Sequence, residues 1–449
     1  MRIFFSIPFI LLFFTANVFA QERVEQTYSF TLEEAIAFAL ENNYSVINAD
    51  RDLTDAQKQK WEVIASGLPQ IDGSVNYQNQ LIQQVIQLPG EIAGEEPGSF
   101  VEVVFGQPQQ VIATGTLRQQ IFDGSYIVGV QATKAFLEYS ANNKEKTDLD
   151  VRKAVTEAYG NVLLARESVA IFEKNRAALD KNLFETQKLF ENGLGEEESV
   201  EQLQITLSSV ENQLKNATRL EKITLQMLNL IMGIDIDAPT RLEDNLDDLT
   251  QKQISLNLLE SDFVLDNNVD YKIVQNLNDQ RFFELKAAKS RALPTLNAFI
   301  NYGAISFSDE FSFLDSDQDW FDFSTFGLDL TIPLFSSLGR SASTQRAKIA
   351  FEKAKTQLSE TEQQLELQWE RAKSDYIFSI EQYDTSKENL RLAERIENKN
   401  EIKYSEGLAT SFELRQAQTQ LYDAQQEYLQ SMVEVINKKT DLEVILNED

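Results

Sequence analysis

Carboxylates are the only plentiful side chains in this chain that could carry out chemistry. The 449 residues include 71 Asp and Glu and 4 Met, but no His and no Cys. Without histidine or cysteine, the chain lacks the commonest general base, the commonest zinc ligand and every Ser-His-Asp or Cys-His arrangement, and it can form no disulfide. An enzyme would have to be a carboxylate-only hydrolase, and no pocket signature of one is present. We therefore expect no catalytic residue and no cofactor.

The densest carboxylates occur in one short segment, residues 306–322. They could hold divalent cations, because Ca²⁺ prefers oxygen ligands, or they could belong to a solvated loop. The spacing of an EF-hand is absent, so we assign no metal ligand. The five side chains are Asp309, Glu310, Asp315, Asp317 and Asp319.

The overall charge is strongly acidic. With 41 basic residues, the formal net charge is -30. A chain of this charge is repelled by nucleic acid and by anionic lipid surfaces. Nucleic acid is therefore not an expected partner.

The N-terminus predicts export. Arg2 is followed by an apolar run over residues 3–14, and Val18-Phe19-Ala20 places small residues where a signal peptidase cuts, so we assign residues 1–20 to a signal peptide. The alternative is a membrane anchor, but the run is too short to cross about 30 Å of hydrocarbon. The next residue is Gln21, so lipid attachment through a terminal cysteine is excluded.

Two internal repeats indicate that one architectural unit has been used twice. An offset of 225 relates Asn42-Asn43 to Asn267-Asn268 and Leu68-Pro69 to Leu293-Pro294. A second offset, of 214, relates Gly193-Leu194 to Gly407-Leu408. Function is therefore expected where the two halves close around a shared axis.

Long helices must form much of each half. Residues 125–192 contain no proline and only two glycines, Gly129 and Gly160, so a helix there could reach about 100 Å. Apolar residues alternate spacings of four and three, as in a coiled coil, which predicts helical hairpins at about 125–232 and 340–449. Glycine at 193 and 407 would supply the left-handed backbone of the turn between the helices. A fibrous rod or a four-helix bundle fits this periodicity equally well.

Period-two segments predict four strands, at about 70–84, 109–122, 295–305 and 323–333. Val75 and Ile300 fall on the apolar face, and Ser74 and Asn301 on the polar face. Each strand has about the length of a tilted membrane-spanning strand, although a half-buried strand of a soluble sheet gives the same pattern. Four strands cannot close a barrel, so a membrane sheet would need strands from other copies. Two copies give almost no lumen, whereas three give a pore.

Several short segments mark the starts and ends of the predicted strands and helices in both halves. They are Leu32-Glu33-Glu34-Ala35, Ala39-Leu40-Glu41-Asn42-Asn43, Leu68-Pro69, Gln120-Ile121-Phe122-Asp123-Gly124, Leu293-Pro294, Ile332-Pro333-Leu334-Phe335 and Tyr404-Ser405-Glu406-Gly407-Leu408. Taken together and in this order, they resemble the TolC-like outer-membrane efflux proteins, the outer membrane factors of tripartite systems. The resemblance implies a mainly α-helical chain with a β-barrel. Three chains would form a homotrimeric twelve-stranded outer-membrane barrel, four strands from each, continued by a long periplasmic coiled-coil tunnel. Residues 21–232 and 266–449 would be the two structural repeats, and 233–265 an equatorial connector.

The resemblance also implies a passive exit duct in the outer membrane of a Gram-negative bacterium. Its partners would be outer-membrane lipid, a periplasmic adaptor and an inner-membrane RND, ABC or MFS transporter, in efflux or type I secretion. A secreted structural coiled coil without pore activity is the alternative.

The same resemblance suggests two kinds of site at the periplasmic end. Gly193, Leu194, Gly407 and Leu408 would be the tips that dock the adaptor. Glu413 would belong to an acidic ring at the periplasmic gate, with Tyr404 as a closing contact. The sequence departs from the family at Gln416, where a second acidic ring is expected. Glu413 is equally compatible with a solvated charge beside the Leu414 seam.

Overall fold

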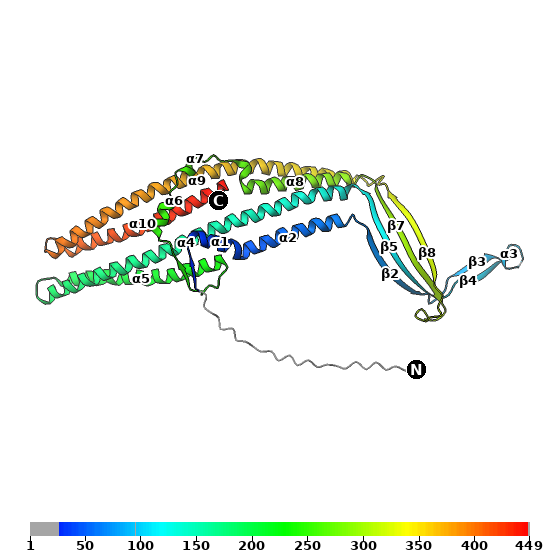
Figure 1. The fold of residues 1–449 in the computed structure, drawn as a ribbon, viewed down its shortest axis with the longest axis horizontal. Coiled ribbons are helices and arrows are strands. Elements are labelled where there is room, and N and C mark those ends of the chain that lie inside the picture. Colours follow the sequence, from blue (N-terminus) through cyan, green and yellow to red (C-terminus); the bar gives the residue numbers. More distant parts are fainter. Residues whose placement is uncertain (1–26, 95, 448–449) are drawn as a thin grey trace, which may run out of the picture.

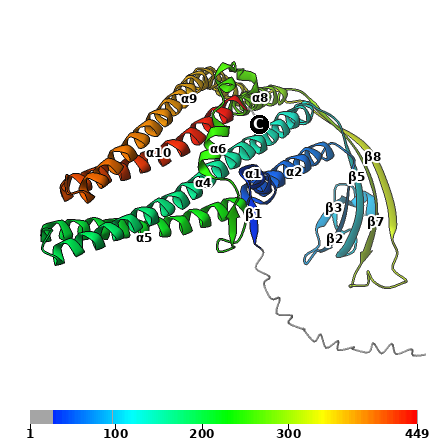
Figure 2. The same ribbon diagram turned by 60° about the vertical axis from the view of Figure 1, so that its left-hand side comes forward.

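The computed structural model describes residues 27–94 and 96–447, so the signal-peptide assignment lies outside the described residues. The protein is elongated, with a curved sheet at one end and long helices running to the other (Figures 1 and 2). The sheet is antiparallel, in the order β2-β5-β7-β8. Its strands are β2 (Gln70–Asn79), β5 (Gln109–Asp123), β7 (Thr295–Ser308) and β8 (Phe321–Thr331).

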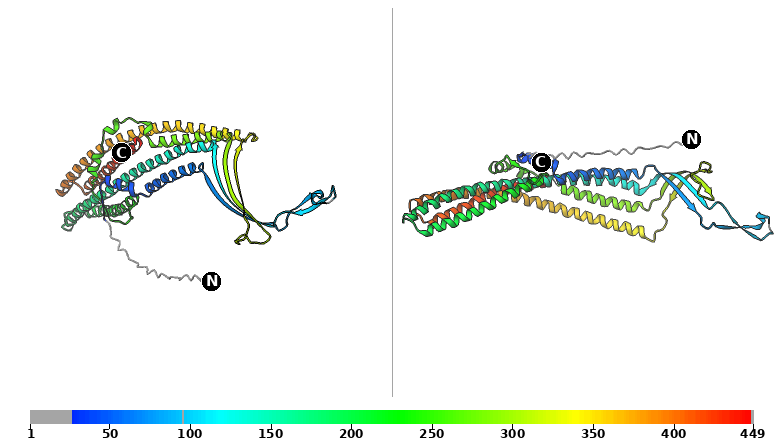
Figure 3. Two further views of the ribbon diagram at one scale, coloured as in Figure 1. Left: turned by 45° about the vertical axis from the view of Figure 1, so that its right-hand side comes forward. Right: turned by 90° about the horizontal axis from the view of Figure 1, so that it is seen from below.

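Four helices continue the four strands in the same lateral order (Figure 1). The chain passes from α2 (Tyr44–Ala65) into β2, and from α8 (Val269–Ser290) into β7. It passes from β5 into α4 (Gly124–Glu191), and from β8 into α9 (Gly339–Ser405). At 1.5 Å per residue, the 68 residues of α4 and the 67 of α9 each extend about 100 Å. Sheet and helices thus form one continuous curved wall, seen from below in Figure 3.

The far half of the wall contains α5 (Glu197–Met232) and α10 (Ser411–Leu446), in the order α5-α4-α10-α9. Two helical hairpins therefore lie side by side, as the periodicity predicted. Residues of the predicted seams are buried, which confirms their phase. They include Val151, Val155, Val162, Val200, Leu203, Val210, Leu414, Ala417 and Val435.

A girdle of short elements lies on one side of the wall, near its middle (Figure 3). β1 (Tyr28–Phe30) pairs in parallel with β6 (Thr240–Leu242), and α1 (Leu32–Asn42), α6 (Leu246–Gln253), α7 (Asn257–Glu260) and η1 (Leu265–Asn267) complete it. The largest apolar core lies here. Tyr159 of α4 is fully buried, and its hydroxyl lies 3.0 Å from the Phe30 carbonyl oxygen and 2.8 Å from an Asp244 carboxylate oxygen.

One part of the strand prediction is wrong. The strand expected over 70–84 ends at Asn79. Between it and the strand expected at 109–122 lies a second antiparallel pair, β3 (Val85–Pro89) with β4 (Phe100–Val104), joined through the short α3 (Gly90–Ala93). Pro89 and Gly90 favour a loop, but β3 belongs to a two-stranded sheet, so it is an edge strand, in which proline is tolerated. The strand predicted at about 323–333 is β8, which ends at Thr331.

None of the helices in the described parts of the chain is long and apolar enough to cross a membrane.

Candidate channel wall and periplasmic tips

The sheet has one apolar and one polar face. A row of directly paired residues on the apolar face, here called the outer face, consists of Ile71, Leu117, Ile300 and Phe326. The neighbouring row on the inner face consists of Asp72, Thr116, Asn301 and Thr325. This alternation agrees with the predicted phase, with Val75 on the outer face and Ser74 on the inner face. A sheet with these two faces can stand between lipid and water.

Two cross-strand pairs on the inner face join phenylalanine to glycine. Phe299 of β7 pairs with Gly327 of β8, and Gly303 of β7 pairs with Phe323 of β8. A Cβ atom at either glycine would overlap the partner's ring. The rings therefore lie down on the neighbouring strand instead of projecting from the sheet, which explains why these two positions are glycine.

Both edges of the sheet are open. Within residues 27–94 and 96–447, β2 pairs only with β5, and β8 only with β7. Every residue of β2 is exposed, as is every residue of β8 except Gly327. Unpaired backbone groups cost several kcal/mol each in hydrocarbon, so this sheet is incomplete as a membrane structure.

Both predicted tip turns have the same helix-ending motif. Gly193 and Gly407 have φ values of 75° and 74°. After α4, Leu194 N–H donates to the Leu189 carbonyl at 2.8 Å, and after α9, Leu408 N–H donates to the Lys403 carbonyl at 2.7 Å. This six-to-one bond, with glycine in the left-handed region, is the Schellman motif. Leu194 and Leu408 are 77% and 73% exposed, so both tips present a leucine to solvent.

Glu413 caps α10. Its carboxylate accepts hydrogen bonds from the Thr410 N–H at 2.8 Å and the Thr410 hydroxyl at 3.0 Å, while the Thr410 hydroxyl accepts from the Glu413 N–H at 3.2 Å. This reciprocal pair is a capping box. The backbone hydrogen bond, followed by the hydroxyl one, holds the pKa of Glu413 below its ordinary value. The Glu413 side chain is exposed, and its lowered pKa keeps it ionised at neutral pH.

Tyr404 joins the two hairpins near their tips. Its hydroxyl lies 2.9 Å from the hydroxyl of Thr186, a buried residue of α4. A second bridge, 3.1 Å long, links the hydroxyls of Ser199 and Ser411 at the starts of α5 and α10. The structure therefore brings Tyr404 to α4, not to Glu413. Sequence reasoning missed Thr186, Ser199 and Ser411, because no local pattern marks a contact between hairpins.

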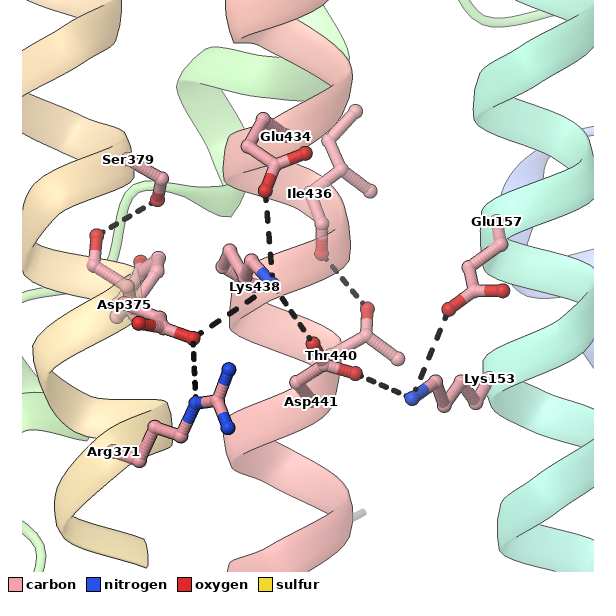
Figure 4. Close-up of polar contacts among 11 residues, drawn as sticks. Lys153, Glu157, Arg371, Asp375, Ser379, Glu434, Ile436, Lys438, Thr440 and Asp441 are labelled. Atoms are coloured by element: carbon pink, nitrogen blue, oxygen red, sulfur yellow. Dashed lines mark hydrogen bonds and ion pairs between the residues drawn. The ribbon is translucent and has the colours of Figure 1, made fainter. Parts of the chain in front are cut away.

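An ion-pair network joins three helices of the wall at the level of the girdle (Figure 4). Lys153 of α4 lies 2.5 Å from Asp441 of α10, and the hydrogen bond to Asp441 raises the pKa of Lys153. Lys438 of α10 lies 3.6 Å from Asp441 and 3.9 Å from Asp375 of α9. Such part-exposed pairs are individually weak, but here they share partners across three helices.

The network lies on the side of the wall that faces away from the girdle. On the girdle side, the Tyr376 hydroxyl donates to the carbonyl of Gln253 in α6 at 2.9 Å, and Lys439 donates to the Gln253 side chain at 2.6 Å. Figure 4 shows the ion pairs in front of the three helices and the green girdle elements behind them. Ion pairs within one helix, at spacings of three or four residues, can be predicted from the sequence. Ion pairs between helices cannot, because they depend on the lateral order of the helices.

The acidic segment is an ordered loop in the part of the chain that the structure describes. Gln318 donates to the Ser306 hydroxyl at 2.8 Å and to the Phe307 carbonyl at 2.9 Å, and Ser312 donates to the Gln318 side chain at 2.6 Å. Among the described residues, no three Asp or Glu side chains converge as they would around a metal ion.

A sheet with one polar and one apolar face, two open edges and helical extensions of about 100 Å defines one protomer of a channel wall. Solved structures share this fold at low sequence identity. The outer membrane protein VceC of Vibrio cholerae is 16% identical, with a TM-score of 0.73 over 93% of this chain and 96% of VceC. The CmeC outer membrane channel of Campylobacter jejuni is 17% identical, with a TM-score of 0.73 over 92% of this chain and 85% of CmeC. The MtrE outer membrane channel of Neisseria gonorrhoeae, solved in its open state, is 16% identical, with a TM-score of 0.71 over 93% of this chain and 89% of MtrE.

Residues 35–234 and 264–448 match the family model described as outer membrane efflux protein, and the chain belongs to this family. It is an outer-membrane protein whose helices extend into the periplasm. The secreted coiled coil without a membrane sheet, kept open above, does not fit this assignment. No curated protein matches the chain by sequence.

Proposed function

We propose that three copies of this chain close a twelve-stranded barrel and a helical tunnel, which together form a passive exit duct through the outer membrane. The observation that carries the proposal is the pair of open edges. β2 and β8 each expose an unpaired backbone on a sheet whose outer face is apolar. Pairing β2 of one copy with β8 of the next removes every edge, and twelve strands leave room for a lumen that eight would fill.

A duct needs a source of cargo on the periplasmic side. We propose that the exposed leucines of the tips, Leu194 and Leu408, contact a periplasmic adaptor, which connects the duct to an inner-membrane RND, ABC or MFS transporter. Apolar side chains held on rigid turns suit a protein interface, since they bury area without ordering a flexible segment. The transporter would supply the energy for transport. This chain would be the passive exit duct, in efflux or type I secretion, and would catalyse no reaction.

We further propose that three Glu413 carboxylates line the periplasmic entrance and favour cations, and that the Tyr404–Thr186 hydrogen bond holds the two hairpins together in the closed state. Support comes from the exposed, ionised carboxylate at the start of α10 and from the 2.9 Å bridge between hairpins. A ring of carboxylates selects cations by charge.

Planar-bilayer recording tests this proposal with a matched pair of variants. Glutamine also suits the third position of a capping box, so Glu413→Gln removes the charge and keeps the cap. The control is Glu34→Gln, which makes the same change in the Thr31 capping box of α1. Under a salt gradient, Glu413→Gln should shift the reversal potential toward zero, and Glu34→Gln should leave it unchanged. Absence of any channel activity in the wild type would contradict the duct itself.

Docking is tested separately by export. A bulky residue at Gly407, as in Gly407→Trp, should abolish export while trimers remain in the membrane. Gly94→Trp is the comparison for trimer yield only, since Gly94 also has a positive φ, of 83°, and open space around it, but lies in the β3–β4 connection. Unchanged export in Gly407→Trp would remove the docking role from this tip.

A further inference from the structure

Strands β3 and β4 form a hairpin, here called the outer hairpin, at the end of the sheet farthest from the helices. It connects β2 to β5 and projects beyond the sheet (Figures 1 and 3). A lone two-stranded hairpin is marginally stable in water, and this one exposes apolar side chains on both faces, including Ile86 at 46% on one face and Phe100 at 66% on the other. A covering surface would therefore stabilise the outer hairpin.

The two faces of the outer hairpin differ in polarity. On one face, the pair Gln87–Glu102 lies between apolar pairs, so that face is mixed. The other face is wholly apolar, with Ile86 exposed and the other three side chains half-exposed, and it is the one that a partner would cover. It consists of Ile86, Leu88, Val101 and Val103.

One row of the inner face near the outer hairpin is largely apolar. In it, Ile112 pairs with Ile305, which pairs with Phe321, whereas the row of Asn301, nearer the helices, is polar. On the outer face at this height, the β7–β8 connection already covers the sheet. The rings of Phe311 and Phe313 lie 5.6 and 6.0 Å from the ring of Tyr77. The uncovered apolar surface at this end, Ile112, Ile305 and Phe321, therefore faces inward, and we call it the inner rim.

We propose that the outer hairpins of three copies pack against one another through their apolar faces, over the inner rim, and restrict the external mouth of the duct. This inference rests on the proposed function, because it requires the trimer. The outer hairpin follows β2, an edge strand, so it stands at the boundary with the neighbouring copy. The partner is thus a second copy of this chain, continuous with the contact that closes the barrel.

The dimensions allow this packing. Twelve strands spaced about 4.8 Å apart and tilted about 40° give a barrel radius of about 12 Å. Residues 80–89 extended at about 3.3 Å per residue reach about 33 Å, more than twice that radius. Residues 80–84 and 105–108 lie outside the strands, and Gly106 has a φ of 87° with open space around it, so no ladder fixes the outer hairpin to the sheet.

Charge favours other copies over lipid as the covering surface. Glu91 lies in α3 at the turn, and Glu102 lies on the mixed face. Ionised carboxylates are costly in hydrocarbon. When the apolar faces meet over the mouth, both carboxylates stay in water.

Cysteine cross-linking tests the packing without background, because the chain has no cysteine. Leu88→Cys lies on the apolar face, and its neighbour Gln87→Cys lies on the mixed face. Mild oxidation of the detergent-extracted trimer should give covalent dimers for Leu88→Cys and none for Gln87→Cys. Intact trimers in which neither cysteine cross-links, or in which both cross-link equally, would overturn the proposal.

Conductance tests the restriction of the mouth. Replacing residues 82–105 by a short Gly-Ser linker should raise single-channel conductance by roughly twofold or more; an unchanged conductance would contradict the restriction. A fluorophore attached at Leu88→Cys and quenched by brominated lipid would place the outer hairpin on the membrane and overturn the packing. Failure to find any trimer would instead contradict the proposed function.

Discussion

The side-chain amide of Asn43 donates a hydrogen bond to the carbonyl oxygen of Ile231 at 2.6 Å, joining the start of α2 to the end of α5. Asn268 does the same in the second half, donating to the Ile445 carbonyl at 2.9 Å and joining α8 to α10. Both asparagines also cap their own helices. Asn43 therefore joins α2 and α5 end to end beside α4, and Asn268 joins α8 and α10 end to end beside α9, which explains why this asparagine recurs at the 225-residue offset.

Substitutions at Asn43 should separate its two roles. Asn43→Ala should cost about 2 kcal/mol, from the lost cap and from an unsatisfied Ile231 carbonyl. Asn43→Asp keeps the cap acceptor but cannot donate to Ile231, so it should cost about 1 kcal/mol. Thermal unfolding in detergent measures both. Asn42→Ala is the control, because the Asn42 amide bonds only within α1, to the Phe38 carbonyl. A loss in Asn42→Ala as large as in Asn43→Ala would show that Asn43 has no special role.

Two glycines with nearly equal backbone conformations should respond differently to alanine. Gly233 and Gly407 have φ values of 76° and 74°. At Gly407 an added Cβ meets open space, so Gly407→Ala should cost about 1–2 kcal/mol from the left-handed backbone alone. At Gly233 the added Cβ would overlap the Asn42 carbonyl, so Gly233→Ala should be clearly more destabilising. Denaturant titration compares the two variants. Equal unfolding midpoints would mean that the backbone at Asn42 moves away from the added Cβ at little cost.

The free-energy cost of an arginine substitution in the sheet should depend on the row and on the face that carry it. The row of Ile300 is apolar throughout, whereas the row of Val75 ends at Asp322 and therefore lies nearer the membrane boundary. Ile300→Arg should cost roughly 2–4 kcal/mol, Val75→Arg less, and Asn301→Arg on the inner face least. The yield of assembled trimer reports the order. Equal yields for Ile300→Arg and Asn301→Arg would show that the two faces are wrongly assigned.

Sequence periodicity predicted the main elements because each is long and consistent with its environment. The seam from Val151 to Phe172 and the alternation from Leu296 to Tyr302 extend over many residues, so a single pattern sets each element. Repetition of Asn43 as Asn268 and of Gly193 as Gly407 added independent support. The outer hairpin was missed because its strands are five residues long and one of them ends in proline.

Contacts between helices could not be predicted in the same way. Thr186 lies 218 residues from Tyr404, and Lys153 lies 288 residues from Asp441, since 441 − 153 = 288. Both contacts depend on α4 lying beside the second hairpin, and a single sequence gives no signal for that lateral order. The cap formed by Glu413 was readable, because Thr410 followed three residues later by Glu is a capping-box pattern.

Glu397 should make stability depend on pH. Burial of its carboxyl, and then the repulsion of Glu401, raise the pKa of Glu397, while Lys174 acts in the opposite direction. The folded chain therefore binds this proton more tightly than the unfolded chain, and stability falls as pH rises from the ordinary value near 4.5 through the raised pKa. Glu397→Gln should thus be more stable than wild type at neutral pH, and the gain should vanish at acid pH. Melting curves across pH measure this, with exposed Glu394→Gln as control. A gain that persists below pH 4 would point to a cause other than ionisation.

The mass of the folded, detergent-extracted protein tests the central claim most directly. Open edges at β2 and β8 require other copies to complete the sheet, and a lumen requires more than two copies. Native mass measurement, with the detergent contribution removed, should give three chains in a single β-sheet-containing species. A stable, folded monomer or dimer would contradict the account.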